Sequence, residues 1–93
     1  MDIRRLRFFI TIVDNGSITR AADVLHIAQP ALSQHVATLE AHFGKKLLIR
    51  AQQGVSMTDA GKVLYRHAQT VLRQIAQAEA DVLSAGELLT GPV

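Results

Sequence analysis

Apolar residues recur at helical spacing near the start of the chain. Between about Ile3 and Asp14 they fall at i, i+3, i+4 and i+7, which predicts an amphipathic helix with one buried face. The predicted buried positions are Leu6, Phe9, Ile10 and Val13. Asn15 and Gly16 end this helix, because glycine adopts the left-handed conformation of a residue just beyond a helix without strain.

A second, short helix is predicted over about Ile18 to Leu25. Ser17 precedes it and is suited to the N-cap, where its hydroxyl can accept a backbone N–H bond. The apolar spacing recurs at Ile18, Ala21, Ala22 and Leu25.

Pro30 marks the start of a third helix. Proline lacks a backbone N–H and fixes φ, so it is tolerated only in the first helical turn. We therefore expect a tight turn at residues 26–28, and a helix that begins at Gln29 or Pro30 and ends at Gly44. Its predicted buried stripe is Leu32, Val36, Leu39 and Phe43. Two helices joined by about three residues, the second opened by proline, indicate a helix-turn-helix over about residues 18–37.

The periodicity changes after the third helix. The segments "KLLIR" and "VSMT" suggest two short strands around "AQQG", with Gly54 in the turn. Each strand alone is a weak prediction. Together, directly after a helix-turn-helix, they indicate the wing of a winged helix.

A long fourth helix is predicted to begin after a cap at Thr58. Its apolar residues alternate in steps of four and three, which is an a/d heptad pattern. They are Leu64, Ala68, Val71, Ile75, Ala78, Val82, Ala85 and Leu89. Such a helix of about 31 residues would be ~46 Å long, more than the small preceding body can cover. We expect the stripe to pack on its copy in a homodimer; the alternative is a missing part of the same chain.

The outward face of the third helix is small and polar and carries no charge. At 100° per residue it presents Pro30, Gln34, Ala37, Thr38 and Ala41, with Ser33 on a flank. Small residues allow a helix to sit deep in the major groove of DNA, where glutamine suits adenine in particular. Gln29, Ser33, Gln34 and Thr38 can bond base edges, and Ala31 or Ala37 can meet a thymine methyl. The alternative is a merely solvated helix.

The charge distribution fits a polyanionic partner. All ten Lys and Arg residues lie at or before Arg73, against five acidic residues, whereas residues 74–93 carry three acids and no base. Candidate phosphate contacts are Arg4, Arg5, Arg7, Lys45, Lys46 and Arg50. An ordinary solvated surface is the alternative. The absence of cysteine, of a membrane-length apolar run and of a signal-peptide core predicts a cytoplasmic chain with no membrane association.

Catalysis is not expected. Ser33 and His35 are two apart on a helix and do not face each other. The histidines at 26, 35, 42 and 67 lack metal-ligand spacing, and no glycine-rich phosphate loop is present. We therefore predict no enzyme, no metal and no cofactor. The serious alternative to DNA binding is a protein-interaction module that dimerises through its long helix; the third helix and the wing favour DNA.

One family resemblance covers about residues 3–68 without a gap. The elements "GSITRAADVLHIAQPALSQHVATLE" and "LIRAQQGVSMTDAG" are together highly specific, and the chain resembles the DNA-binding domain of the LysR-type transcriptional regulators. The resemblance implies a mainly α fold, with a winged helix-turn-helix at 1–58 and a dimerising linker helix, usually antiparallel, at 59–90. It also implies that residues 91–93 begin a hinge to an effector domain absent here.

The resemblance also implies roles for single residues. Gln29, Pro30, Ser33, Gln34 and Thr38 match positions that read bases or contact the DNA backbone, Arg50 matches the wing arginine, and Thr58 matches the threonine that opens the linker helix. The full candidate DNA-contacting set is Gln29, Pro30, Ala31, Ser33, Gln34, Thr38, Arg50, Gln53, Thr58 and Arg4.

Several positions depart from the family pattern. Many members carry arginine at 34 and further basic residues at 37 or 38. In this chain Gln53 replaces a second basic wing residue, and Ala28 replaces a serine whose side-chain cap is worth ~1 kcal/mol of helix stability. Binding should therefore be less electrostatic than in the average member. The expected target is double-stranded DNA with an imperfect palindrome, its half-sites spaced by about 34 Å or a multiple. A tetramer in a longer parent protein stays open.

Overall fold

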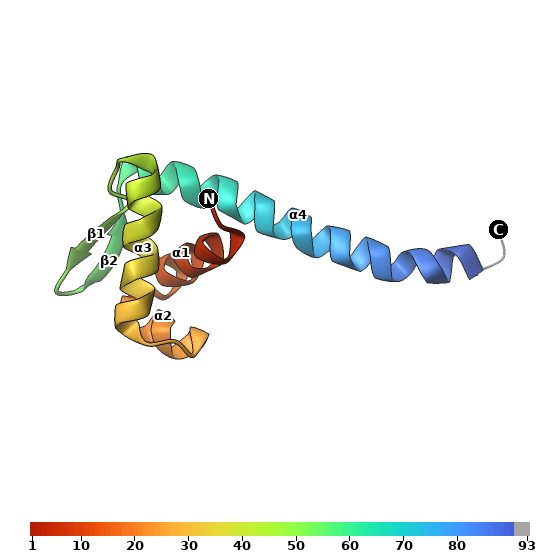
Figure 1. Ribbon diagram of the computed structural model, residues 1–93, viewed down its shortest axis with the longest axis horizontal. Coiled ribbons are helices and arrows are strands. Elements are labelled where there is room, and N and C mark those ends of the chain that lie inside the picture. The colour runs from red at the N-terminus through yellow and green to blue at the C-terminus, as the bar shows by residue number, and fades with distance from the viewer. Residues whose placement is uncertain (91–93) are drawn as a thin grey trace.

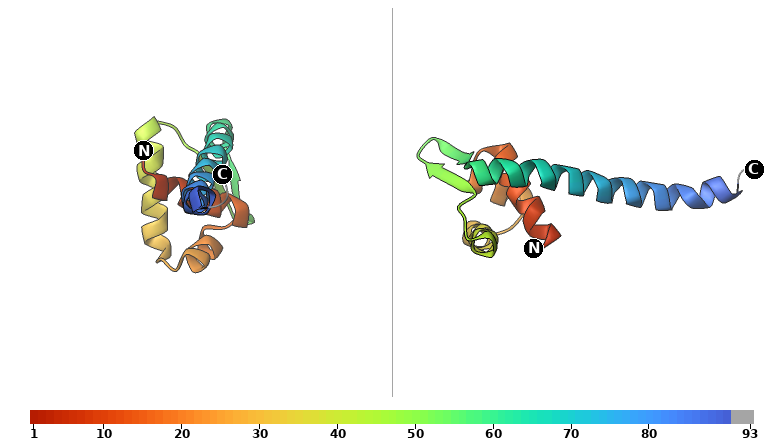
Figure 2. Two further views of the ribbon diagram at one scale, coloured as in Figure 1. Left: turned by 90° about the vertical axis from the view of Figure 1, so that its right-hand side faces the viewer. Right: turned by 90° about the horizontal axis from the view of Figure 1, so that it is seen from above.

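The computed structural model describes residues 1–90, with side chains as far as residue 85, and has the predicted mainly α architecture (Figure 1). The elements in order are α1 (Ile3–Asn15), α2 (Ile18–Leu25), α3 (Gln29–Phe43), β1 (Leu48–Ala51), β2 (Gly54–Met57) and α4 (Asp59–Thr90). The first three helices, the β-hairpin and the first turns of α4 form a head, from which the rest of α4 extends as a shaft (Figures 1 and 2). The molecule measures 58 × 26 × 20 Å.

The helix ends follow local chemistry. Gly16 ends α1 at φ 65°, and the Ser17 hydroxyl caps α2 by accepting the backbone N–H of Arg20 at 3.1 Å. His26 ends α2 in the left-handed conformation at φ 58°. Ala28 gives α3 no side-chain cap, and Pro30 lies in its first turn. These results confirm the predicted turns, and α1 runs one residue further than expected.

The head has a small, mostly aliphatic core that includes the fully buried Phe9. Its buried members are Leu6, Phe9, Ile12, Ile18, Ala21, Ala22, Leu32, Val36, Leu39, Leu47, Leu48, Leu64 and Ala68. Two predictions about burial were wrong. Ile12 is fully buried, whereas Ile10 and Val13 are only half-buried, because α2, α3, α4 and β2 all contact α1 and shift its buried arc. Phe43 is 39 % exposed, since it is the last residue of α3 and lies at the edge of the head.

The wing is a two-stranded antiparallel hairpin. Its register pairs Leu48 with Met57 and Ala51 with Gly54, so the loop is Gln52–Gln53 and Gly54 belongs to the strand rather than to the turn. Gly54 has φ 137°, and a Cβ on it would lie 2.6 Å from the carbonyl oxygen of Gly16. The neighbouring Val55 N–H donates to that same oxygen at 3.0 Å. The base of the wing is therefore fixed to the turn between α1 and α2.

The first turns of α4 belong to the head. The Thr58 hydroxyl caps the helix by accepting the backbone N–H of Gly61 at 3.0 Å, as predicted. Leu64 and Ala68 are 9 % and 1 % exposed and pack in the core of their own chain. They are therefore core residues of the head, contrary to the prediction that a dimer interface begins at Leu64. The predicted contact at Leu89 and the predicted hinge at 91–93 lie outside the residues whose side chains the structure describes.

Candidate nucleic-acid interface

The outward face of α3 is a continuous, uncharged surface. Leu32, Val36 and Leu39 are buried against the head, as predicted. Positions on the opposite side are exposed: Gln29, Pro30, Ala31, Gln34, Ala37 and Ala41. Ser33 and Thr38 are half-buried on the flanks. We call these eight residues the outer face of α3. The helix therefore presents amide tips and methyl groups to solvent, with no charge among them.

Two features of α3 determine which hydrogen bonds its flank and its first turn can still make. The Thr38 hydroxyl donates to the Gln34 carbonyl at 3.0 Å, so its proton is committed to the helix and its oxygen keeps acceptor capacity. The first turn has neither a side-chain cap nor an acidic residue. An uncapped helix start carries partial positive charge, which suits a phosphate group.

One flank of α3 is held by a contact that no local sequence pattern indicates. His35 is half-buried, and the centroid of its ring lies 4.9 Å from the centroid of the Phe8 ring. Its Nδ1 accepts a bond from Arg5 Nε at 3.3 Å. Arg5, expected on phosphates, is thus partly committed to α3. Arg4 is exposed, with its guanidinium carbon 6.0 Å from the Phe8 ring centre.

The wing lies beside the outer face of α3 and supplies positive charge. A groove of about 560 Å³ separates them, lined by Ala37, Glu40, Lys46, Leu48, Ile49, Arg50 and Thr58. Arg50 and Gln53 are exposed on the wing, as are Lys45 and Lys46 in the segment before β1. The structure thus brings Ala37 and Arg50 to one groove, although thirteen positions separate them in the sequence.

Glu40 and Thr58 join the parts of this surface. Glu40 Oε2 accepts backbone N–H bonds from Leu47 at 2.7 Å and Leu48 at 3.3 Å. The Thr58 hydroxyl donates to the Lys46 carbonyl at 2.7 Å. Because Thr58 both caps α4 and holds this segment, its hydroxyl has a structural role, which the predicted DNA contact did not anticipate. Nothing in the sequence distinguished Glu40 from a solvated charge.

The described part of the chain has few other sites of chemical interest. Within it no three His, Cys, Asp or Glu side chains gather where a metal ion could bind. Every buried side-chain polar atom among these residues has a hydrogen-bond partner. None of the described helices is apolar enough over a sufficient length to cross a membrane.

Comparison with known proteins gives the same picture. Residues 3–62 match the family model of the bacterial regulatory helix-turn-helix protein, lysR family. The chain is 58 % identical over its full length to the nitrogen assimilation regulatory protein nac of Klebsiella aerogenes, of which it spans 30 %. The chain therefore covers about a third of the length of such curated relatives.

Two solved structures of DNA complexes resemble the chain closely. One is the BenM_DBD/benA site 1 DNA complex, with a TM-score of 0.86 and 36 % identity over 91 % of this chain and 99 % of that one. The other is the CbnR_DBD–DNA complex, with a TM-score of 0.85 and 30 % identity over 92 % of this chain and 99 % of that one. From the family match over most of its length, the chain belongs to the lysR family of bacterial regulatory helix-turn-helix proteins.

Proposed function

We propose that this chain is the DNA-binding part of a bacterial transcriptional regulator, and that α3 reads sequence in the major groove. The observation that carries the proposal is the exposed, uncharged outer face of α3 beside a cationic wing. Amide side chains such as Gln29 and Gln34 can bond adenine in two places, while alanines allow close approach to the bases. Ser33, Thr38 and Ala31 complete the reading surface at its flanks and start.

Affinity and discrimination come from different residues in this proposal. Lys46 and Arg50 line the groove between α3 and the wing, and Lys45 lies at the end of α3 nearby. In this proposal all three contact phosphates, with Arg50 reaching the backbone or the minor groove. Gln53, at the wing tip, adds a polar contact there. Arg4, exposed on α1, adds phosphate attraction from the other side of α3.

The similarity to two DNA complexes supports DNA binding over the alternative of a pure protein-interaction module. Selection of bound duplexes from a random pool tests this choice. We expect an imperfect palindrome with half-sites about one helical turn apart, ~34 Å, or a multiple. Equal retention of all duplexes after several rounds would contradict sequence-specific recognition.

We further propose a homodimer through α4. Beyond the head, Val71 is 39 % exposed and Val82 is 74 % exposed, and they lie on one side of the shaft with Ile75 and Ala78. Ala85 continues the stripe, and the sequence places Leu89 after it. The first half of α4 carries Lys62, Arg66 and Arg73, and the second carries Glu79 and Asp81. Antiparallel packing sets each basic half beside an acidic half and is therefore favoured.

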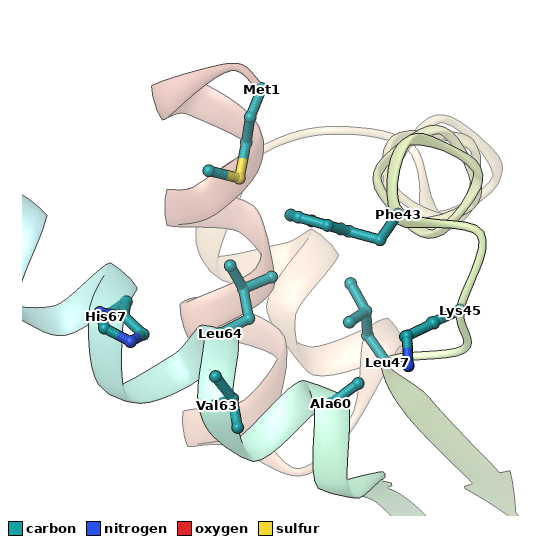
Figure 3. A pocket seen from close by; sticks show the side chains of 8 residues that line it. All are labelled: Met1, Phe43, Lys45, Leu47, Ala60, Val63, Leu64 and His67. Carbon is teal, nitrogen blue, oxygen red and sulfur yellow. The ribbon is translucent and has the colours of Figure 1, made fainter.

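An apolar pocket lies at the head end of this stripe (Figure 3). Its volume is about 470 Å³, and its lining includes Met1, Phe43 and Val63, all of them exposed. Val82 is 19 positions beyond Val63, so about 28 Å further along α4. In an antiparallel pair, numbering runs in opposite directions along the two helices. If Ile75 of the second copy lies against Val71, position 82 of that copy lies opposite position 64, so its Val82 lies beside this pocket. The second copy is the occupant we assign to it.

The likeness to the nitrogen assimilation regulatory protein nac supports a role in nitrogen assimilation for a regulator that contains this chain. A cytoplasmic location is part of the same proposal. We propose that the two proteins read similar operators. Parallel selection with this chain and with the Klebsiella aerogenes protein tests the idea, and two unrelated preferred sequences would contradict it. Control by an effector domain and assembly into a tetramer are proposals for a longer parent chain.

A further inference from the structure

The short segment between α3 and the wing is held by one carboxylate. Glu40 leaves α3 near its end, and only 12 % of its side chain is exposed. Its Oε2 accepts two successive backbone N–H groups, those of Leu47 and Leu48. Its Oε1 lies 3.7 Å from Nζ of Lys46, whose side chain is 83 % exposed. A carboxylate can accept several bonds at once, and charged acceptors bind N–H groups more strongly than neutral ones.

The same segment is fixed from its other side by the start of α4. Thr58 donates its hydroxyl to the Lys46 carbonyl and its backbone N–H to the Leu47 carbonyl, at 2.7 and 3.0 Å. Gly61 lies so close to the Leu47 carbonyl oxygen that a Cβ there would overlap it. Residues 46–48 are therefore tied to α3 by Glu40 and to α4 by Thr58. They lead directly into β1, which carries Arg50.

From this arrangement we infer that Glu40 is a positioning residue for DNA recognition, one that sets the separation between the outer face of α3 and Arg50. Without these two bonds, the base of the wing loses the side-chain hydrogen bonds that hold it to α3, while its bonds to Thr58 and to the Gly16 carbonyl remain. The inference rests on the proposed DNA binding. It makes a prediction opposite to simple electrostatics, because removing a negative charge beside DNA should by itself tighten binding.

Binding by the full chain to its selected duplex gives the first test. We expect Glu40→Ala to weaken specific binding about tenfold, the loss expected for charged hydrogen bonds of this strength. Glu40→Gln keeps one acceptor oxygen and should recover part of the loss. Asp23→Ala removes a charge from an exposed position on α2 and serves as the charge-matched control, expected to bind equally or more tightly. Tighter binding by Glu40→Ala would overturn the inference.

A double-mutant cycle with Arg50→Ala separates positioning from general destabilisation. If Glu40 acts through the wing, Glu40→Ala costs far less once Arg50 is absent, and it no longer changes the salt dependence of binding. Equal costs in both backgrounds would overturn the inference, since loss of overall stability affects both backgrounds alike.

Distance measurement without DNA tests the structural step alone. The chain has no cysteine, so spin labels at Ala41→Cys and Gln53→Cys, both exposed, report the separation of α3 and the wing. We expect Glu40→Ala to broaden this distance distribution and Asp23→Ala to leave it unchanged. An unaltered distribution would overturn the inference while leaving the proposed DNA binding intact. If Glu40→Ala broadens the distance distribution but the unmutated chain prefers no duplex, the proposed sequence-specific DNA binding is refuted instead.

Discussion

The head and the shaft bury their apolar residues in opposite ways. In the head, Phe9 and Leu32 are completely buried by residues of their own chain. On the shaft, Val82 is 74 % exposed, although it belongs to a stripe with the same helical spacing. Apolar periodicity therefore shows which face of a helix is buried but not what covers it. The head buries its apolar residues within this chain, whereas the described part of the shaft leaves much of its stripe exposed.

The largest expected difference between head and shaft is in the loss of folding stability caused by alanine substitutions. Leu32→Ala removes a core side chain, and we expect it to lower the free energy of unfolding by roughly 2–5 kcal/mol at every protein concentration. Val82→Ala should cost under about 0.5 kcal/mol in a dilute, monomeric sample, and more as dimers form. Denaturant titrations over a range of concentrations measure both. A cost at Val82 that does not change with concentration would argue against a dimer that uses the shaft.

Charges on the stripe should separate the dimer without unfolding the head. We expect Val71→Asp with Ile75→Asp to give monomers in sedimentation and to weaken palindrome binding by at least about a hundredfold, because linkage of two binding modules is lost. Ala76→Asp with Ala80→Asp places the same charges four apart on exposed positions away from the stripe. This control should remain dimeric. Dimers from the stripe variant would move the interface elsewhere.

Local chemistry made much of the fold predictable. Ser17, Pro30 and Gly16 fix helix ends by their own hydrogen bonds or backbone preferences, so the helix-turn-helix was predicted nearly to the residue. The outer face of α3 followed from the buried stripe opposite it. Ile12 was missed because the direction of burial on α1 depends on four neighbouring elements.

Other features depend on contacts between distant segments and have no local signal. The stripe of α4 reads as one heptad pattern, yet Leu64 and Ala68 are covered by the head and the later positions are not. Glu40 bonds backbone groups seven and eight residues away, and His35 meets Arg5 across 30 positions. No sequence pattern distinguishes these two residues from solvated polar ones.

Within the head, the helix and the wing should contribute to DNA binding in different ways. Gln29→Ala should reduce the difference in binding free energy between the specific and a random duplex by ~1–3 kcal/mol. Arg50→Ala should weaken binding to both duplexes and lower the slope of log affinity against log salt concentration by ~1 unit. Titrations of the two duplexes at several salt concentrations distinguish these effects. Equal losses on both duplexes for Gln29→Ala would contradict its assigned role in reading bases.

The smallest effect concerns the joint between head and shaft. Tyr65 on α4 donates its hydroxyl to Asp14 Oδ1 on α1. This hydrogen bond, burial and the Asp14 charge raise the pKa of Tyr65 above its ordinary 10.0, because each disfavours the phenolate. The bond therefore stabilises the folded chain fully below pH 10, and this stabilisation is lost as the pH rises through the folded-state pKa.

The chain has a single tyrosine and no tryptophan, so its ultraviolet absorbance reports Tyr65 alone. We expect the phenol to titrate above pH 10 in the folded chain and closer to 10 in Asp14→Asn, which removes the charge and keeps an acceptor oxygen. Tyr65→Phe should lose less stability than the unmutated chain as the pH rises beyond 10, because it has no phenol to ionise. An unshifted titration in the folded chain would show that α4 is free of α1 at this point. The boundary between head and shaft would then lie closer to Leu64.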